Sequence, residues 1–319
     1  MARICVLGGT GFIGQHLLNR LVSGVEKIVV PTRRLAHARE LYPLPTVEVV
    51  EADIHDDATL ARLVSGCTAV VNLVGVPHSR PSRSGKDSFG PDFARAHVEL
   101  PARLAEASAR AGVEHLVHIS ALGASANAPS EYLRSRAAGE AAILAARDRV
   151  HATVFRPSIV FGPEDRFLNL FARMQRRLPL LLLPCPDARF QPVFVGDVAQ
   201  CIVRCLFDPE TYHRNYDLCG PKQYTLRELV QYVGQVSGHR RPIIGLSDSL
   251  SYLQAGMMEW MPGKLMTRDN VRSMKVPNVC QCEFPFGLHP NPLEALAPAW
   301  LSGRDPRARL YSLRSKAGR

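Results

Sequence analysis

The sequence contains no apolar run long enough to cross a membrane and no Cys-x-x-Cys pair. Its densest hydrophobic stretch, residues 178–183, is far shorter than a membrane span. Only Met-Ala-Arg precedes the apolar run at residues 4–7, which leaves no room for a signal peptide, so we expect a cytoplasmic protein. The eight cysteines are scattered, with Cys201 and Cys205 at helical spacing and Cys280 and Cys282 at strand spacing. We expect them to be buried and reduced, with metal or disulfide roles as the alternatives.

Acidic residues are in the minority, with 29 Asp and Glu against 39 Lys and Arg, for a net charge of +10. This balance favours a polyanionic neighbour such as a nucleotide, an anionic membrane face or an acidic protein surface. The arginines are dispersed and no stripe of basic and aromatic residues occurs, so the sequence does not indicate nucleic-acid binding. The basic C-terminal tail is either a solvated end or a docking element, and it consists of Arg304, Arg307, Arg309, Arg314, Lys316 and Arg319.

The first half of the chain alternates short β-branched runs with helix-period segments. This alternation predicts a doubly wound, Rossmann-type parallel sheet with right-handed crossovers. Near-continuous apolar runs fit strands that are covered on both faces. The expected strands are residues 3–7, 27–30, 47–50, 69–74, 115–120 and 152–156.

Beyond about residue 161 the alternation fades and prolines become frequent. We therefore expect a nucleotide-binding domain over residues 1–160 and a smaller, loop-rich lobe over 161–319, with parts of 190–220 packing back on the sheet. A strand at 193–195 should lead into a helix that Asp197 caps, with orientation of a loop over the nucleotide as the alternative role of Asp197. The Thr225–Glu228 spacing predicts a capping box at the start of another helix. Met257, Met258, Trp260 and Met261 indicate a core helix, or else a ligand- or membrane-facing groove.

A glycine-rich turn follows the first expected strand and opens the first helix. In this position glycines allow a tight turn, a close approach to a pyrophosphate and close packing of helix on strand. The backbone amides of the helix N-terminus would then face the diphosphate. The turn comprises Gly8, Gly9, Thr10, Gly11, Phe12, Ile13 and Gly14.

The end of the second expected strand distinguishes NAD from NADP. An NAD site usually has Asp or Glu there, which binds the ribose hydroxyls. This chain has Arg33 and Arg34 and no acid. Two guanidinium groups can bind a 2′-phosphate, so the sequence predicts NADP(H) in preference to NAD(H).

Two later strand ends supply further candidate contacts with the dinucleotide. Asp53 and Ile54 follow the third strand, where a carboxylate could accept a hydrogen bond from the adenine amino group. The stretch Asn72, Leu73, Val74 and Gly75 ends the fourth strand, where we expect the ribose.

These features, in this order, resemble the short-chain dehydrogenase/reductase superfamily in its extended or atypical branch. A narrower resemblance, to the nucleotide-binding accessory subunit of respiratory complex I and its bacterial relatives, covers nearly the whole chain. The stretches that carry it are HISALG at 118–123, YLRSRAAGE at 132–140, RPSIVFGPEDRF at 156–167, QPVFVGDV at 191–198 and MTRDNV at 266–271.

The superfamily resemblance implies roles for Ser120 and Tyr132. In catalytic members the tyrosine exchanges a proton with the substrate, the serine polarises the substrate oxygen, and a lysine four residues after the tyrosine lowers its pKa and binds the nicotinamide ribose. Here position 136 is arginine. A guanidinium keeps the charge but cannot act as a proton shuttle. Tyr132, Arg136 and Pro157 are also expected to contact the cofactor, and an anchoring role for Tyr132 and Arg136 remains the alternative to catalysis.

Two main functions follow from these observations. The complex I resemblance implies a tightly held NADPH with a structural or regulatory role, a protein partner in a respiratory complex, and peripheral contact with the inner face of a membrane. The alternative is an active NADP-dependent oxidoreductase, epimerase or dehydratase that uses Ser120 and Tyr132. A sensor of the NADP⁺/NADPH ratio is a third hypothesis. The sequence predicts no metal ion.

Overall fold

The structure is a computed structural model that describes residues 2–80, 89–260 and 265–303. Contacts divide the chain into two compact units. The first unit comprises Met1–Pro157, Val195–Leu218 and Glu283–Leu288. The second comprises Ser158–Phe194, Cys219–Cys282 and His289–Arg319. The Met261 position and the basic C-terminal tail from Arg304 onward lie outside the described residues.

A seven-stranded parallel sheet forms the centre of the first unit, in the order β11-β6-β5-β4-β1-β2-β3. The chain order reverses direction between β1 and β4, as in a doubly wound fold. The strands are β1 (Arg3–Leu7), β2 (Lys27–Thr32), β3 (Val47–Glu51), β4 (Ala69–Asn72), β5 (His115–Ile119), β6 (His151–Pro157) and β11 (Asn215–Leu218).

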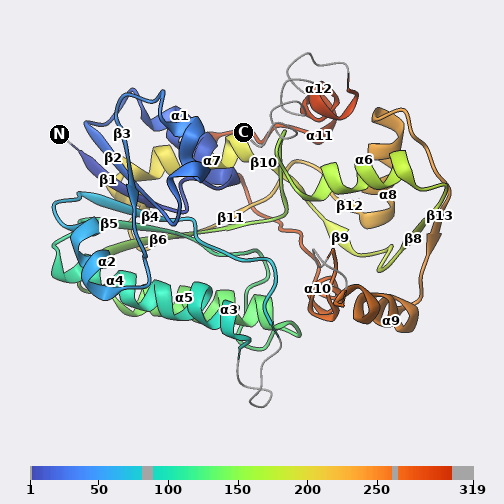
Figure 1. Cartoon of the computed structure of the whole chain (residues 1–319), viewed down its shortest axis with the longest axis horizontal. Helices are drawn as coiled ribbons and strands as arrows, with labels where there is room; N and C mark the ends of the chain where they lie inside the picture. The colour runs from blue at the N-terminus through green and yellow to red at the C-terminus, as the bar shows by residue number, and fades with distance from the viewer. Residues whose placement is uncertain (1, 81–88, 261–264, 304–319) are drawn as a thin grey trace. The chain divides into compact units, whose positions relative to one another are not determined.

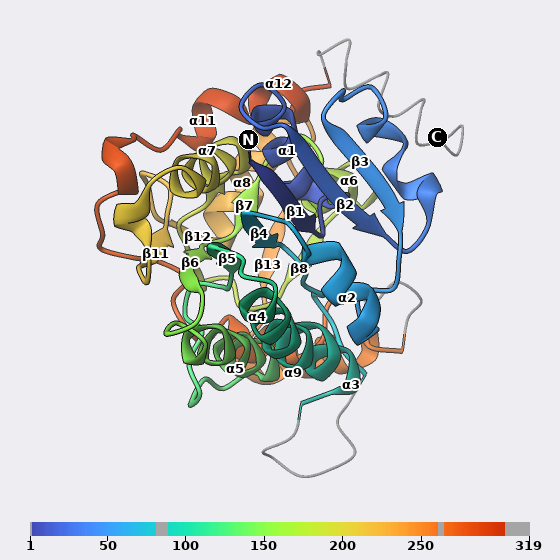
Figure 2. The same cartoon turned by 90° about the vertical axis from the view of Figure 1, so that its left-hand side faces the viewer.

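Helices cover both faces of this sheet. In Figures 1 and 2, α1 (Phe12–Leu21) and α7 (Val195–Leu206) lie side by side on one face, and α2 (Asp57–Val64), α4 (Leu100–Arg110) and α5 (Glu131–Ala145) lie on the other. The remaining helical segments of the unit are η1 (Leu35–Leu41), α3 (Pro91–Phe93), the π-helix η2 (Ala94–Glu99), η3 (Pro209–Thr211) and η4 (Pro285–Gly287).

The apolar patterning explains this arrangement. All residues of β4 and β5 are buried, as expected for parallel strands covered on both faces. Leu100 and Leu104 of α4 are fully buried against Leu116 and Val70 of the sheet. Local caps fix where helices begin: the Asp56 carboxylate accepts a hydrogen bond from the Thr59 amide at 2.7 Å, and the Ser130 hydroxyl accepts one from the Leu133 amide at 3.2 Å.

The predicted fold class is confirmed, and the six expected strands of the first half are present with ends that differ from the expected ones by at most two residues. The strand expected at 193–195 is the two-residue β10 (Val193–Phe194). The prediction that Asp197 caps the next helix is wrong, because α7 begins at Val195 and Asp197 lies inside its first turn. The Asp197 carboxylate is still near the positive end of the helix dipole, where a negative charge stabilises the helix.

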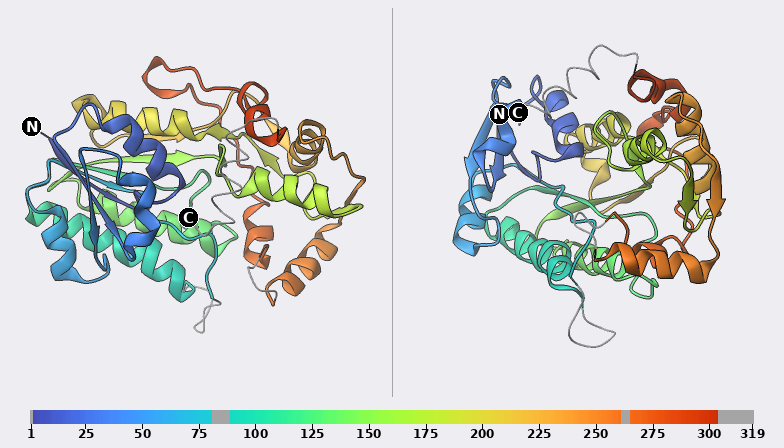
Figure 3. Two further views of the ribbon diagram at one scale, coloured as in Figure 1. Left: turned by 45° about the horizontal axis from the view of Figure 1, so that its top comes forward. Right: turned by 45° about the vertical axis from the view of Figure 1, so that its right-hand side comes forward.

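The second unit has its own core and three two-stranded sheets, which pair β10 with β7, β12 with β9 and β13 with β8. Figure 3 shows these short strands and the helices of the unit from two further directions. Its other elements are β7 (Val160–Phe161), α6 (Phe167–Arg177), β8 (Leu181–Leu183), β9 (Arg189–Phe190), β12 (Tyr224–Thr225), α8 (Leu226–Val236), β13 (Ile243–Gly245), α9 (Asp248–Met258), α10 (Arg268–Ser273), α11 (Leu293–Leu296) and α12 (Pro298–Leu301).

Two sequence predictions for this unit have different outcomes. The capping box at Thr225 and Glu228 is confirmed, since each side chain bonds the other residue's backbone amide. The core-helix interpretation of α9 is wrong for Met257 and for Trp260 just beyond the helix end, which are 60% and 90% exposed. Met258 packs on a small cluster around Ala255. Within the described residues, no helix is both long and apolar enough to span a bilayer.

Candidate functional site

The glycine-rich turn joins β1 to α1 at the carboxyl end of the sheet. Gly8 has φ +77°, a left-handed conformation that favours glycine. A Cβ at Gly8 would lie 3.0 Å from the carbonyl carbon of Leu73 and 3.2 Å from the amide nitrogen of Val74. The turn therefore passes directly against the backbone that follows β4.

The other glycines of the turn meet distinct packing demands. A Cβ at Gly9 would lie 2.8 Å from the Val30 side chain, and one at Gly14 would lie 2.6 Å from the Cα of Gly9. Gly11 is exposed and serves as the N-cap of α1 without any side-chain hydrogen bond. The amides of Phe12, Ile13 and Gly14 in the first turn of a helix have no intrahelical acceptor, so this end of α1 can bind an anion.

The turn lies at the point where the strand order reverses. β1 and β4 are hydrogen-bonded neighbours, and the chain leaves them toward opposite sides of the sheet. In doubly wound folds the ligand binds in the crevice at the carboxyl ends of such a pair. Leu73, Val74 and Gly75 directly follow β4, so the structure brings them together with the glycine-rich turn.

Arg33 and Arg34 directly follow β2, and both side chains are exposed. In the described part of the chain, neither guanidinium pairs with a carboxylate. The Thr32 hydroxyl donates to the carbonyl of Arg34 at 3.1 Å and ends the strand. The nearby acid is Glu51 of β3, which accepts a hydrogen bond from the Leu35 amide at 3.3 Å. The two arginines are thus free to meet an anion from solvent.

Asp53 and Ile54 lie between β3 and α2. One oxygen of the Asp53 carboxylate accepts from the His55 amide at 2.9 Å, and the other lies 3.6 Å from the Arg95 guanidinium. Ile54 is partly buried and packs on the core. Asp53 therefore has a local structural role, and its second oxygen faces an exposed ion-pair partner that a ligand could displace.

Arg136 of α5 binds the ends of two strands together. Its guanidinium donates to the carbonyl of Val74 at 3.3 Å and to that of Ile119 at 3.2 Å. A Cβ at Gly75 would lie 2.9 Å from its Cζ. The same Cζ lies 5.4 Å from the centre of the Tyr132 ring. The guanidinium therefore contacts the residues after β4, the residue before Ser120 and the expected catalytic tyrosine.

Ser120 follows β5 and is 3% exposed. Its backbone amide donates to Phe155, but its hydroxyl has no hydrogen-bond partner within the described residues. A buried hydroxyl normally has a partner, so this one indicates a place for a ligand or water. Pro157 is buried at the end of β6, and its carbonyl accepts from the Leu122 amide at 3.0 Å. Both residues lie at the carboxyl edge of the sheet.

Sequence reasoning missed His97, which lies in the π-helix η2 and is 1% exposed. The Val76 amide donates to its Nε2 at 3.0 Å, so Nδ1 carries the proton and donates to the Ser135 hydroxyl at 2.9 Å. Ser135 in turn donates to the Tyr132 carbonyl at 2.8 Å. No motif in the sequence marks this chain of bonds, although π-helical segments often occur at functional sites.

His118 forms a second buried link. Its Nδ1 accepts from the Asn72 side-chain amide at 3.1 Å, and the Asn72 oxygen accepts from the Val74 amide at 3.1 Å. Burial lowers the pKa of both histidines, and the positive charge of Arg136 lowers it further. The pKa of His118 falls to about 3 and that of His97 to about 2. Both imidazoles are therefore neutral at physiological pH, and they hold the post-β4 backbone in place.

The fold and this site define the class of the protein. Residues 4–219 match the NAD dependent epimerase/dehydratase family, and the chain belongs to that family. This confirms the predicted class, the extended branch of the short-chain dehydrogenases/reductases, and with it a nicotinamide dinucleotide as the ligand type.

Several individual proteins are similar to this chain in sequence or in fold. The chain is 32% identical over 309 residues to the mitochondrial NADH dehydrogenase [ubiquinone] 1 alpha subcomplex subunit 9 of Mus musculus, covering 91% of this chain and 77% of that one. It is 29% identical over 249 residues to a ceramide reductase of Caulobacter vibrioides, covering 77% and 74%. A dTDP-glucose 4,6-dehydratase double mutant from Streptomyces venezuelae, with NAD and DAU bound, has the same fold, with a TM-score of 0.66 at 22% identity over 77% of this chain and 85% of that one.

The residues present fit a nicotinamide dinucleotide. Two features at the carboxyl edge of the sheet support this fit: the uncapped, glycine-lined N-terminus of α1, and the Ser120 hydroxyl, which has no hydrogen-bond partner among the residues that the structure describes. When bound, the nicotinamide ring of such a group can accept or donate a hydride.

Proposed function

We propose that this protein holds NADP(H) as a tightly bound structural or regulatory group, in the manner of a complex I accessory subunit, and oxidises or reduces it negligibly. One observation carries the proposal: the Arg136 guanidinium is bonded to the carbonyls of Val74 and Ile119. A guanidinium stays protonated at any physiological pH, so it cannot relay a proton. In this position it ties α5 to two strand ends.

Each part of the site has a role in this proposal. The turn from Gly8 to Gly14 presents backbone amides to the diphosphate, and Arg33 and Arg34 bind the 2′-phosphate. Asp53 and Ile54 contact the adenine. The nicotinamide half lies against Leu73, Val74 and Gly75, with Tyr132, Arg136 and Pro157 around it. A dinucleotide whose free concentration is about a thousand times its Kd would stabilise the folded chain by about 4 kcal/mol.

A partner surface also supports this function. Along and just beyond α9, four large apolar side chains recur every three or four residues: Leu250, Leu253, Met257 and Trp260, which are 51%, 60%, 60% and 90% exposed. We call this set the α9 stripe. Such a stripe on a chain of net charge +10 suits a protein partner or the anionic inner face of a membrane, which would make the protein cytoplasmic and peripheral.

The test is to identify the dinucleotide that accompanies the purified protein and to follow its absorbance at 340 nm. We expect NADPH by mass spectrometry and no measurable oxidation across panels of carbonyl and quinone acceptors. Sustained turnover on any acceptor would overturn the proposal. Absence of any dinucleotide, with no uptake of added NADPH, would overturn it independently.

An active NADP-dependent reductase, epimerase or dehydratase is the second candidate, and the unpartnered hydroxyl of Ser120 favours it. In that case Ser120 would polarise a substrate oxygen, and the Tyr132 hydroxyl would exchange a proton with it. Similarity to a ceramide reductase makes this worth testing. If a substrate is found, Tyr132→Phe should abolish turnover while NADPH still binds.

A further inference from the structure

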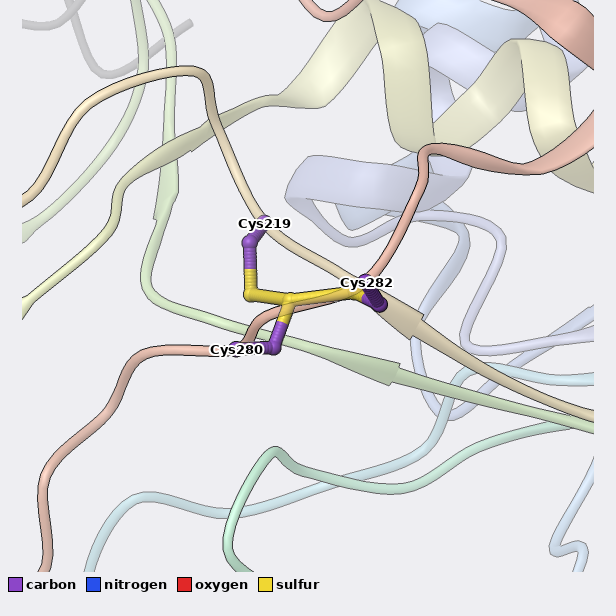
Figure 4. Close-up of side chains that lie close together, drawn as sticks. All are labelled: Cys219, Cys280 and Cys282. Carbon is purple, nitrogen blue, oxygen red and sulfur yellow. A yellow bond between two sulfur atoms is a disulfide. The ribbon is translucent and has the colours of Figure 1, made fainter.

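Three cysteines of the second unit converge on one point. Cys219 directly follows Leu218, and Cys280 and Cys282 lie on the stretch after α10; Figure 4 shows their side chains pointing toward one another. The three sulfur atoms all lie within 4.8 Å of one another. The Cα atom of Cys280 lies 6.3 Å from the Cα atom of Cys219 and 5.6 Å from that of Cys282, and both separations suit a disulfide. The expectation of buried cysteines is wrong for Cys280 and Cys282, which are half-buried and exposed, and the geometry favours the disulfide alternative for this trio.

The surrounding backbone holds the trio in place. The Gln191 side chain accepts from the Cys280 amide at 3.0 Å and donates to the Gly220 carbonyl at 2.7 Å, so one residue binds both cysteine-bearing segments. The Gln191 amide also donates to the Asn278 carbonyl at 3.0 Å. A Cβ at Gly220 would collide with the Pro192 carbonyl, which fixes that segment closely.

Exposure rises in steps across the trio. Cys219 is buried, Cys280 is half-buried and Cys282 is exposed. Cys280 lies within bonding reach of both others, and a sulfur atom forms one disulfide at a time. In the oxidised trio one cysteine therefore lies outside the disulfide, and Cys282 is the exposed position at which a small thiol or disulfide can reach the site.

We propose that the trio is a reversible disulfide site in which Cys280 bonds either Cys219 or Cys282. In the oxidation step two cysteine thiols and one small disulfide of the glutathione type give one protein disulfide and two small thiols, so the cysteines are oxidised and the small disulfide is reduced. In the exchange step the Cys282 thiolate attacks Cys280 Sγ. The Cys280–Cys282 bond forms, the Cys219–Cys280 bond breaks, and Cys219 leaves as a thiolate that takes up the proton lost by Cys282.

The two bonds constrain the chain very differently. Cys219–Cys280 spans 61 positions, whereas Cys280–Cys282 spans two. The chain re-enters the second unit between Leu218 and Cys219 and leaves it again between Cys282 and Glu283. The long-range bond therefore links the two ends of the segment Cys219–Cys282 covalently, and exchange to the local bond removes that covalent link and leaves the hydrogen bonds of Gln191. Closing the longer loop restricts the unfolded chain more.

A metal ion is the competing occupant, and the ligand count argues against it. Within the described residues, the sulfurs of this trio have no fourth Cys, His, Asp or Glu ligand atom grouped with them. Structural zinc sites are almost always closed by four protein ligands.

The experiment uses the full-length protein equilibrated with reduced and oxidised glutathione, then alkylated and mapped by peptide mass spectrometry. We expect both the 219–280 and the 280–282 bonds, with one thiol of the trio alkylated per chain. Oxidised Cys282→Ser should hold only the long-range bond, and its Tm should fall by about 5 °C on reduction. Oxidised Cys219→Ser, which can form only the short local loop, should shift by about 2 °C.

Cys185→Ser is the matched control, since Cys185 is an unpaired, partly buried cysteine of the same unit, and it should map like the wild type. Full alkylation of all three thiols at every glutathione ratio would overturn the proposal. So would one Zn²⁺ per reduced chain that each of the three serine variants loses. The wild-type peptide map decides the question even if a variant fails to fold, and no outcome depends on the dinucleotide.

Discussion

The guanidinium of Arg136 occupies the space that a Cβ at Gly75 would need. Because the same group donates to the carbonyls of Val74 and Ile119, an alanine at position 75 would force the guanidinium to move and would weaken those two hydrogen bonds. This pair fixes the backbone where the nicotinamide half of a dinucleotide is proposed to lie.

Replacing Gly75 with alanine should therefore destabilise the protein by about 1–3 kcal/mol, the usual cost of overpacking. Removing the guanidinium as well, in Gly75→Ala/Arg136→Ala, should restore part of that loss. Urea unfolding of both single variants and the double variant measures the coupling between them. Strict additivity of the two single effects would contradict this packing relationship.

The glycine turn offers a sharper pair of variants. A Cβ at Gly14 would meet the backbone of Gly9, so Gly14→Ala should cost about 3 kcal/mol or prevent folding. At Gly24, just after the same helix, the nearest atom to a Cβ is 3.9 Å away, so Gly24→Ala should change stability by less than about 0.5 kcal/mol. Thermal unfolding compares the two variants, and similar Tm values would contradict the close approach of Gly14 to the backbone of Gly9.

Acid should destabilise the fold through its buried, neutral histidines. Burial, with the charges of His151 and His213, lowers the pKa of His115 to about 4. An unfolded histidine titrates near 6.5, so the unfolded chain binds protons first, and the contribution to stability is complete above pH 6.5 and lost as the pH falls toward 4. At pH 5 the loss is about 2 kcal/mol for each such histidine.

We therefore expect the loss of unfolding free energy between pH 7 and pH 5 to be about 2 kcal/mol smaller in His115→Gln than in the wild type. His37→Gln is the control, because His37 is exposed. An unchanged pH dependence in His115→Gln would mean that His115 is protonated in the folded state.

The α9 stripe predicts binding to anionic vesicles of phosphatidylglycerol and phosphatidylcholine that weakens as salt increases. Trp260 is the more exposed of the two tryptophans, so its emission should shift to the blue on binding. Leu253→Asp should abolish co-sedimentation, whereas Leu35→Asp, an exposed leucine of the other unit, should not. Equal binding by both variants would exclude the stripe as the contact.

The sequence predicted the sheet well because its signals are local. The buried strands read as apolar runs, and the glycine turn has a steric requirement at each position, so both could be found without a structure. The prediction that Asp197 caps α7 is wrong because the helix starts two residues earlier, at Val195, where no typical capping residue marks the boundary.

Other features depend on long-range contacts. Cys219 meets Cys280 across 61 positions, and His97 reaches Val76 and Ser135 on other elements, so no spacing rule indicates either. The sequence leaves the exposure of Met257 and Trp260 undecided for a related reason, since an apolar helix face looks the same in sequence whether it is covered or not.

Calorimetric titration of NADPH and NADH into dinucleotide-free protein tests the central claim most directly. We expect NADPH to bind at least about tenfold more tightly than NADH, and Arg33→Ala with Arg34→Ala to remove that preference at a cost of about 1.4 kcal/mol or more for NADPH alone. Arg39→Ala, an exposed arginine of the following helix, is the control and should leave both affinities unchanged. Equal affinities for the two dinucleotides in the wild type, or no binding of either, would contradict the proposed function.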